Sequence, residues 1–589
     1  MTTTYLQKWN LDNLFSRDTK SISQATNKTI EFSIDSLSKD ILILEERLNQ
    51  TKEIASLVLS LQEIEMQCNE IESYIGCLLA QDVTDLKAVQ WNDHLSSLKS
   101  SIENCSNKLN ALLLNLSDVE LNLLLKDKSI QPIGFLVQER CQWAKQKLPI
   151  AQEQLVNELS IDGYQGWERL YEATMGQQLI SYQDGKTTKE LSVGQAENKL
   201  TNPDRLIRST MFKKLENTWQ SQENSFAQIL NHLGGFRIKV YQARGWNSVL
   251  HEPLYFNRMQ KSTLDTMWDT VKNNKTPIQS YLNKKAKLLG LTKLSWYDVE
   301  APLPTNSQQT ISYNDAADLI ITQFHVISPD MGKFAEHAFK HKWIEAEDRA
   351  GKMPGGFCSH HPKSKESRIF MTYSGTTNNL FTLAHELGHA YHGHAIRNLP
   401  YMAQQYRMNV AETASTLAEM IISDSILKGT KDPIMRQSLL DNKLQRAVIF
   451  LMNIHSRFIF ENRFYEARKK GFVTSVELNQ MMTDAQKEGF CDALGEWHPH
   501  FWVSKKHFYI TDVPFYNFPY TFGYLFSMGI YAMSKELGNE FEKHYNALLC
   551  DTGRMTVEDL AQKHLGVDLK QPLFWQNALN SVKNDVDLF

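Results

Sequence analysis

The chain has 589 residues, of which 42% are hydrophobic and 22% charged, and its formal net charge is -4. A soluble chain of this length exceeds one ordinary domain and can bury a large core. The small net charge argues against nucleic acid as a partner. Seven scattered cysteines without a C-x-x-C pair argue against a disulfide framework and against a cysteine zinc site. The first residues lack an apolar signal region and no run of about 18 apolar residues occurs, so we expect a cytoplasmic protein with no membrane partner.

Long helices are predicted first along the chain. Between residues 36 and about 115, apolar residues such as Ile41 and Leu61 recur at spacings of three and four. A second helix is predicted at about 86–116. Because no a/d register persists, these stripes indicate an antiparallel helical bundle rather than a coiled coil.

A turn and a break follow the helices. Asp184-Gly185 lies between two short β-like runs and predicts a hairpin at 181–187. Asn202-Pro203-Asp204 marks a break and a helix start. We therefore place the end of an N-terminal helical region at residue 204, and helical patterns return after it.

The composition of the chain changes at residues 351–376, where a glycine-rich loop precedes a β-branched and aromatic run. The loop around Gly355 and Gly356 lacks the Gly-Lys-Ser/Thr ending of a phosphate loop, so nucleotide binding is not expected. The β-branched and aromatic run at 368–373 predicts a strand. Its open edge could pair with an extended peptide, or it could be an ordinary strand of a sheet.

The most informative segment is H-E-x-x-H at 385–389. Positions four apart on a helix lie on one face, roughly 40° apart around the axis, so His385 and His389 can reach one metal ion. Glu386 can reach a water at that metal, which is the arrangement of a zinc peptidase. Coincidence is the alternative, because the chain has 18 histidines. The proline-free helical context after Thr376 or Thr377 favours the metal site.

A catalytic zinc site needs a third protein ligand besides His385 and His389. The metzincin class would place a histidine where this chain has Ala395, and His392 and His394 have the wrong angular spacing. Glu412 is the best candidate, because it lies in an alanine-rich helical segment that can pack closely on the first helix. Glu419 lies two turns further on and is either an exposed acid or the carboxylate that orients a ligand histidine.

Several segments together resemble the thimet oligopeptidase and oligoendopeptidase F family of zinc metallopeptidases, on the side of bacterial oligoendopeptidase F. The resemblance covers about 205–585 well and the N-terminal region more loosely. The matching runs are MPGGFC (353–358), RIFMTYSGT (368–376), FTLAHELGHAYH (381–392), AETAS (411–415) and HFYITDVPFYNFPYTFGYLFS (507–527).

The resemblance implies a mainly α, two-lobed helical peptidase with a deep substrate channel and a small β-sheet beside the H-E-x-x-H helix. It implies an oligoendopeptidase F-type N-terminal domain within about 115–185 and a zinc metallopeptidase catalytic domain over 205–589. His385, His389 and Glu412 match the family's ligands to one Zn²⁺ per chain, and Glu386 matches its catalytic base. We expect Gly355, Gly356, Phe357 and Tyr373 to bind substrate.

The segment 507–524 is rich in hydroxyl-bearing aromatics, and Tyr516, Tyr520 and Tyr524 are spaced at i, i+4 and i+8, so we expect them to share one helical face. A packing role is one interpretation, but a buried core would more cheaply use Phe. The family places a His and one or two Tyr over the substrate carbonyl, which fits His507, Tyr516 and Tyr520 best. Tyr509 and Tyr524 stay alternatives.

These observations predict a zinc-dependent endopeptidase that hydrolyses short, unstructured peptides. A zinc carboxypeptidase or dipeptidase of similar helical fold is the main alternative, and it would need a fixed cation for the terminal carboxylate. A non-catalytic helical peptide-binding protein with a structural zinc is disfavoured, because such a site needs no base at Glu386. The sequence does not specify an oligomeric state.

Overall fold

The chain divides into two compact units in the computed structural model, which describes residues 4–15, 27–45, 51–185, 187–304 and 310–589. Unit 1 comprises residues 1–147, 308–425 and 530–566, and unit 2 comprises residues 148–307, 426–529 and 567–589. Both units are mainly helical. Because the chain passes between the units several times, this division does not follow the boundary at residue 204, which stays a prediction about sequence domains.

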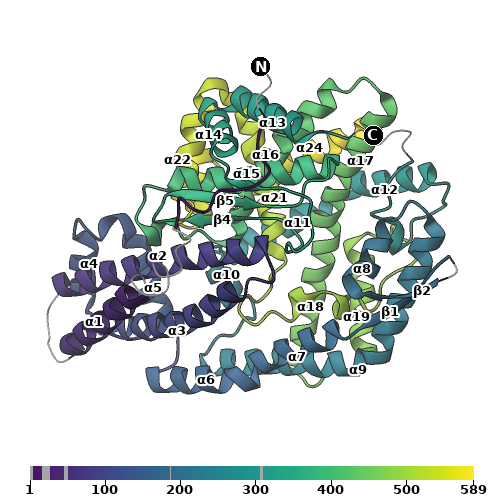
Figure 1. Ribbon diagram of the computed structural model, residues 1–589. Helices are drawn as coiled ribbons and strands as arrows, with labels where there is room; N and C mark the ends of the chain where they lie inside the picture. The colour runs from purple at the N-terminus through teal and green to yellow at the C-terminus, as the bar shows by residue number, and fades with distance from the viewer. Residues whose placement is uncertain (1–3, 16–26, 46–50, 186, 305–309) are drawn as a thin grey trace. The chain divides into compact units, whose positions relative to one another are not determined.

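Unit 1 begins with five helices, drawn in purple and blue in Figure 1: α1 (Asn27–Glu45), α2 (Thr51–Gln81), α3 (Leu86–Leu114), α4 (Asp118–Lys126) and α5 (Gly134–Ala144). The predicted helical bundle is thereby confirmed. Asp85 accepts hydrogen bonds from the first turn of α3, and Ser117 forms a capping box with Glu120 at the start of α4. Such caps satisfy amide groups that have no partner within the helix and so fix where each helix begins.

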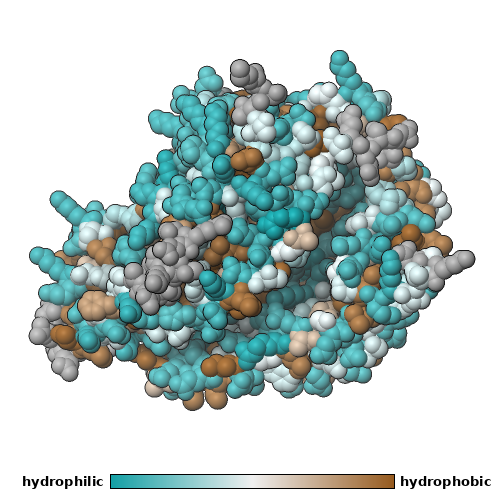
Figure 2. Space-filling model, in the orientation of Figure 1, coloured by the Kyte–Doolittle hydropathy of each residue, from teal (hydrophilic) through white to brown (hydrophobic). Residues whose placement is uncertain are grey.

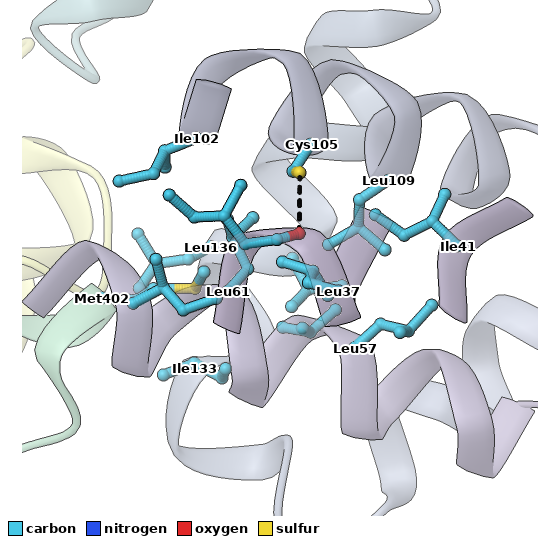
Figure 3. Packing of buried hydrophobic residues seen from close by; sticks show 14 of the residues in the cluster. Leu37, Ile41, Leu57, Leu61, Ile102, Cys105, Leu109, Ile133, Leu136 and Met402 are labelled. Atoms are coloured by element: carbon cyan, nitrogen blue, oxygen red, sulfur yellow. Dashed lines mark hydrogen bonds between the residues drawn. The ribbon is translucent and has the colours of Figure 1, made fainter. Parts of the chain in front are cut away.

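The apolar stripes of these helices meet in one core (Figure 3). Leu37, Leu61 and Leu109, from α1, α2 and α3, are almost fully buried in it. The thiol of Cys105 donates to the Ile34 carbonyl at 3.9 Å. Met402 also belongs to this core, so the N-terminal helices pack against the segment that follows the H-E-x-x-H helix.

The rest of unit 1 surrounds a small sheet. Its helices are α13 (Tyr313–Ile327), α14 (Pro329–Lys340), α15 (Thr377–Ile396), most of α16 (Met408–Gly429), α22 (Phe541–Asp551) and α23 (Val557–Leu565). Its strands are β3 (Ile344–Glu345), β4 (Phe357–His361) and β5 (Glu366–Phe370). The sheet contacts α2 and α15, so the helix that carries the H-E-x-x-H motif is held against a strand layer.

The strand order decides between the two interpretations of the run at 368–373. The order is β3-β5-β4, with β5 parallel to β3 and antiparallel to β4. The predicted strand at 368–373 corresponds to β5, which has a neighbour on each side and therefore no open edge. Instead, β4 lies at an edge of this sheet, with Phe357 paired opposite Phe370.

Unit 2 opens with α6 (Ile150–Gly163) and α7 (Gln165–Gly176), followed by β1 (Leu179–Asp184) and β2 (Thr187–Ser192). The two strands form the predicted antiparallel hairpin, and Gly185 takes the positive φ of 63° that its turn needs. Short α8 (Val193–Glu197) leads to α9 (Arg205–Ala243). The side chain of Asp204 accepts from Leu206 N at 2.8 Å, so the predicted helix start after Pro203 is confirmed.

The remaining helices of unit 2 include α20 and α21, between which most of the aromatic segment lies. They are α10 (His251–Phe256), α11 (Lys261–Asn273), α12 (Thr276–Leu288), α17 (Pro433–Val448), α18 (Ile454–Arg468), α19 (Ser475–Gly489), α20 (Phe501–Ser504), part of α21 (Phe518–Leu537) and α24 (Pro572–Leu588). A π-helical turn, Ile449–Asn453, joins α17 to α18. Hydrophilic residues cover much of the face drawn in Figure 2, with apolar ones scattered among them. None of the described helices is both long and apolar enough to span a bilayer.

Candidate metal centre and active site

The helix α15 presents two histidines to one point. Thr376, one of the two threonines that the sequence offered as the helix start, caps it by accepting from Asn379 N at 3.1 Å. With the first turn fixed, His385 and His389 fall on one face, and their Nε2 atoms lie 3.1 Å apart. Burial lowers the pKa of His389 well below its usual value, and the neighbouring His385 adds to the effect. A neutral imidazole is the form that binds a metal.

Gly388, between these histidines, sets how closely α16 approaches α15. A Cβ at position 388 would lie 2.5 Å from the Ala414 carbonyl oxygen and 2.6 Å from Ser415 Cα, both in the backbone of α16. Only glycine allows this contact. The contact brings Glu412, one turn before Ser415, alongside the two imidazoles.

Three ligand atoms converge as a result. Glu412 Oε2 lies 3.3 Å from His385 Nε2 and 3.6 Å from His389 Nε2. Ligand atoms about 2.0–2.1 Å from a tetrahedral metal stand about 3.3 Å from one another. His385, His389 and Glu412 are the group that could hold a metal ion among the described residues. Two neutral imidazoles and one carboxylate form a donor set that fits Zn²⁺.

Further side chains of α16 hold these ligands. His385 Nδ1 donates to Glu419 Oε1 at 2.5 Å, and Glu419 is 6% exposed, so it is not a surface acid. This bond leaves Nε2 of His385 without a proton and turned toward the other ligands. The Ser415 hydroxyl donates to Glu412 Oε2 at 2.8 Å. Sequence reasoning missed Ser415, although its place one turn after Glu412 is a usable signal.

Glu386 lies next to the ligands and is buried. Burial raises the pKa of this carboxyl to about 7; the charge of Glu412 also raises it and His385 opposes the shift. Glu386 Oε2 is a buried oxygen with no hydrogen-bond partner among the residues the structure describes. A buried carboxylate oxygen without a protein partner is suited to accept a proton from a small molecule at the site.

The loop that contains Gly355 and Gly356 also lies next to Glu386. A Cβ on Gly356 would lie 3.6 Å from Glu386 Oε1, so the backbone of the loop passes directly beside this carboxylate. Gly355 has a φ of 98°, in the left-handed region that favours glycine, and space is open around it. Phe357 follows as the first residue of the edge strand β4. The structure thus brings Gly356 close to Glu386, whereas the ring of Phe357 stacks on Phe370, with centroids 5.2 Å apart.

Tyr373, predicted to bind substrate, is placed differently. Its ring is 6% exposed and packs edge-on against Tyr313, and its hydroxyl donates to the Ile311 carbonyl at 3.0 Å. Burial raises the pKa of this phenol to about 12. These contacts favour a packing role, because the hydroxyl proton is already used within unit 1, and a contact of Tyr373 with substrate stays a prediction.

The other histidines of α15 stay apart from the ligands. His392 is fully buried and stacks on Tyr406. Its Nε2 forms a hydrogen bond with the Thr552 hydroxyl at 2.9 Å. His394 packs against Phe334. Both histidines thus make their contacts away from the three ligand atoms, and neither belongs to the group that could hold a metal.

A second group of candidate residues lies in unit 2. The ring of His507 stacks on Tyr516, with centroids 5.0 Å apart and planes at 13°. The hydroxyl oxygens of Tyr516 and Tyr520 lie 3.5 Å apart. His507, Tyr516 and Tyr520 are all half-buried, so their polar atoms can reach a molecule outside the core.

The expectation that Tyr516, Tyr520 and Tyr524 share one helical face is wrong for Tyr516. The helix α21 begins only at Phe518. Phe515 has a φ of 54°, which a right-handed helix does not contain, so the chain turns at Tyr516 before the helix starts. Tyr516 reaches Tyr520 through this turn rather than through helical spacing.

The two alternative tyrosines are packed in the core. Tyr509 is fully buried and stacks on Tyr171 at 3.9 Å. Tyr524 is 7% exposed and stacks on Phe450 at 4.7 Å. Burial raises the pKa of both phenols well above the usual value. Their positions favour packing over contact with a substrate.

Comparison with known proteins gives consistent matches. The sequence model of peptidase family M3 matches residues 199–581, and that of oligopeptidase F matches residues 113–177. An oligoendopeptidase F homolog of Lactococcus lactis is 25% identical over 410 residues, which cover 67% of this chain and 65% of the relative. The chain therefore spans just under two thirds of the length of the curated relatives that it matches first.

Solved structures share the fold. A crystal structure from Chlamydophila abortus superposes with a TM-score of 0.83 at 20% identity and covers 98% of both chains. The oligoendopeptidase-F of Enterococcus faecium superposes with a TM-score of 0.71 at 19% identity, covering 96% of this chain and 98% of that one. At these identities the superpositions establish the mainly helical fold.

Proposed function

The chain belongs to peptidase family M3, and from this premise we propose that it is a zinc-dependent endopeptidase that hydrolyses internal bonds of short, unstructured peptides. One observation carries the proposal. The ligand atoms of His385, His389 and Glu412 converge beside the buried, unpartnered carboxylate oxygen of Glu386. A purely structural zinc site would have no use for such a base.

His385, His389 and Glu412 would hold the metal. When bound, zinc would supply Lewis-acid polarisation of the scissile carbonyl and would lower the pKa of a water at the open position. The bond from His385 Nδ1 to Glu419 fixes the ligand's tautomer and orientation. We propose one such ion per chain.

Glu386 is the proposed base. Its free carboxylate oxygen takes a proton from the attacking water and later returns the proton to the leaving nitrogen. Burial raises the proton affinity of this carboxylate, and a stronger base takes the proton more readily. Gly356 lies beside it, and the missing side chain lets the backbone of the glycine loop pass close to this carboxylate.

The unit 2 group is proposed to stabilise the oxyanion. His507 donates through its imidazole N–H, and Tyr516 or Tyr520 through a hydroxyl, to the oxygen on which negative charge develops. The stacking of His507 on Tyr516 and the half-exposure of all three rings support this assignment. Each such donor typically lowers the barrier by about 3 kcal/mol.

The edge strand β4 is the proposed docking line for an extended peptide. At its far end the Ser73 hydroxyl already donates to the His360 carbonyl at 2.8 Å, which leaves the stretch next to Phe357 and Gly356 for the substrate. Main-chain pairing along β4 would lay the scissile bond past Glu386. This pairing requires an extended segment, and an unstructured peptide can adopt that conformation without any loss of folded structure.

Two domain assignments and a cellular location complete the proposal. The match at residues 113–177 supports an oligopeptidase F-type N-terminal domain, and the match at 199–581 supports a catalytic domain over 205–589. All seven cysteines are free, which suits the reducing cytoplasm that we propose as the location.

A peptide-library digest read by mass spectrometry tests the function. We expect internal cleavage of peptides of roughly 5 to 20 residues, lost on treatment with a chelator and restored by zinc. Peptides blocked at both ends should be cut as fast as free ones. Cleavage that requires a free terminal carboxylate would instead favour the carboxypeptidase alternative, and efficient digestion of a stable folded protein would overturn the proposed substrate class.

A further inference from the structure

Arg457, on α18, contacts the two segments that carry the candidate oxyanion donors His507 and Tyr516. Its Nη1 donates to His507 Nδ1 at 3.2 Å and to Asn517 Oδ1 at 2.9 Å. Asn517 directly follows Tyr516. One guanidinium therefore joins the short helical turn that carries His507 to the turn that carries Tyr516.

The chemistry of this contact fixes where the proton of His507 lies. A guanidinium has five N–H donors and no acceptor, so the ring nitrogen that faces it must accept. Nδ1 of His507 is that nitrogen, and a neutral imidazole then carries its proton on Nε2. We propose that Arg457 is a positioning residue that holds His507 with Nε2–H as the donor presented to the reacting carbonyl.

Arg457 is itself held rigidly. Its Nε donates to Asn453 Oδ1 at 2.8 Å, and its guanidinium lies over the Phe501 ring, 5.0 Å from the centroid. Asn453 ends the π-helical turn that joins α17 to α18. π-Helical turns are found at functional sites more often than elsewhere. Asn453 and Arg457 are four residues apart, so helical spacing brings their side chains into contact.

The charges around His507 agree with a neutral donor. Burial lowers the pKa of His507 to about 4, and the cations that face it, Arg457 from α18 and Lys505 and Lys506 from its own segment, lower it further. Within the described chain no carboxylate forms an ion pair with Arg457, and no hydrogen bond reaches His507 Nε2. The ring is thus neutral at neutral pH, and its Nε2–H is available to a substrate.

This inference rests on the proposed role of His507, and a double-mutant cycle separates the two. His507→Gln should lower kcat by about 10²–10³-fold with little change in KM. Arg457→Met removes the donor but keeps a long side chain, and should lower kcat by between roughly tenfold and that full loss. If Arg457 acts only through His507, the double variant should be no slower than His507→Gln alone.

Two further variants guard against a folding artefact. Arg457→Lys keeps one cationic donor and should recover part of the lost kcat. Arg463, on the same helix, forms an exposed ion pair with Glu488, and Arg463→Met is the matched control that should retain wild-type kcat. Each variant is compared at equal zinc content and after its thermal unfolding has been recorded.

The tautomer is read directly in the wild-type protein. Two-bond ¹H–¹⁵N correlation spectra of ¹⁵N-histidine-labelled enzyme, with His507 assigned by its loss in His507→Gln, should show a proton on Nε2 and none on Nδ1. A proton on Nδ1, kcat of Arg457→Met within two-fold of wild type, or losses that multiply in the double variant would each overturn the inference. Full activity of His507→Gln would instead overturn the oxyanion role, whatever the tautomer.

Discussion

Gly388 of α15 lies so close to Ala414 of α16 that a Cβ on the glycine would stand 2.5 Å from the Ala414 carbonyl oxygen. This approach places a carboxylate from one helix beside two imidazoles from another. The metal centre therefore depends on a glycine that binds nothing itself.

Gly388→Ala should move the two helices apart and weaken the site. Overpacking typically costs about 1–3 kcal/mol of stability, and the displaced Glu412 should lower zinc affinity as well. Thermal unfolding and a competitive zinc titration measure the two effects. Gly76→Ala, on the exposed face of α2 with open space around it, is the matched control and should be neutral or slightly stabilising. Equal zinc affinity in Gly388→Ala and wild type would contradict the packing argument.

Glu386→Gln and Glu412→Ala should distinguish the role of Glu386 as the base from the role of Glu412 as a zinc ligand. Glu386→Gln should bind zinc normally and lose about 10²–10⁴-fold in turnover, because only proton transfer is removed. Glu412→Ala should lose zinc, because one of three ligand atoms is gone. Metal analysis and peptide cleavage are measured on both. Full zinc occupancy in Glu412→Ala, or turnover of Glu386→Gln within a few-fold of wild type, would refute the corresponding role.

Glu419→Gln should weaken zinc binding by about 10–100-fold, the usual effect of losing a carboxylate that orients a ligand histidine. The cause is the bond from His385 Nδ1 to Glu419 Oε1 at 2.5 Å. Zinc affinity is the measurement. Glu336→Gln, which removes an exposed acid paired with Lys340 on α14, is the control and should bind zinc as wild type does. If the two variants behave alike, Glu419 does not orient the ligand.

Tyr516→Phe or Tyr520→Phe should lower kcat and kcat/KM together by about 10²–10³-fold while KM changes little. The change removes a hydroxyl and almost no volume, so stability should hardly move. Steady-state kinetics on a short peptide give both constants. The same change at Tyr509 and Tyr524, both packed in the core, supplies controls with no kinetic effect. A large kcat loss at either control would shift the donor role to that residue.

The stability of unit 2 should fall as pH rises above 6.5, because of His500. Burial lowers the pKa of His500, but hydrogen bonds to Glu216 and Glu223, both at 2.9 Å, outweigh this effect and raise it above 6.5. A group whose folded pKa is raised stabilises the fold fully below its unfolded pKa and loses that contribution as pH rises through the folded pKa.

Chemical denaturation across pH 6 to 9 measures this loss as a falling free energy of unfolding. His500→Gln should flatten that part of the curve. His94→Gln, which removes a half-exposed histidine paired with Glu31, is the control and should leave the curve unchanged. An unchanged slope in His500→Gln would assign the pH dependence to another group.

Local patterns in the sequence predicted the features that local geometry sets. The i, i+4 spacing of His385 and His389 fixes their common face because an α-helix repeats every 3.6 residues. Thr376 marks the start of α15 through its side chain, and Asp184-Gly185 marks the hairpin through the positive φ at glycine. These signals act over a few residues, so no tertiary contact is needed to interpret them.

The position of Glu412 follows from the local sequence pattern and the tertiary packing together. The alanine-rich segment indicated a helix that could pack closely, but only the tertiary contact at Gly388 brings Glu412 Oε2 within 3.3 Å of His385 Nε2. Likewise, the sequence left Glu419 open between an exposed acid and an orienting carboxylate. Its burial and its bond to His385 follow from which face of α16 meets α15.

Other features followed from the tertiary structure alone. The run at 368–373 indicated a strand, and β4 directly before it is its antiparallel neighbour. The parallel neighbour β3 lies further back in the chain, so no local pattern could reveal that β5 is central. The contact between Arg457 and His507 spans 50 residues of sequence, and the left-handed Phe515 breaks the helical spacing expected of Tyr516. Periodicity determined which elements form and which face each residue occupies, whereas strand order, helix approach and side-chain pairing depend on long-range packing that periodicity does not encode.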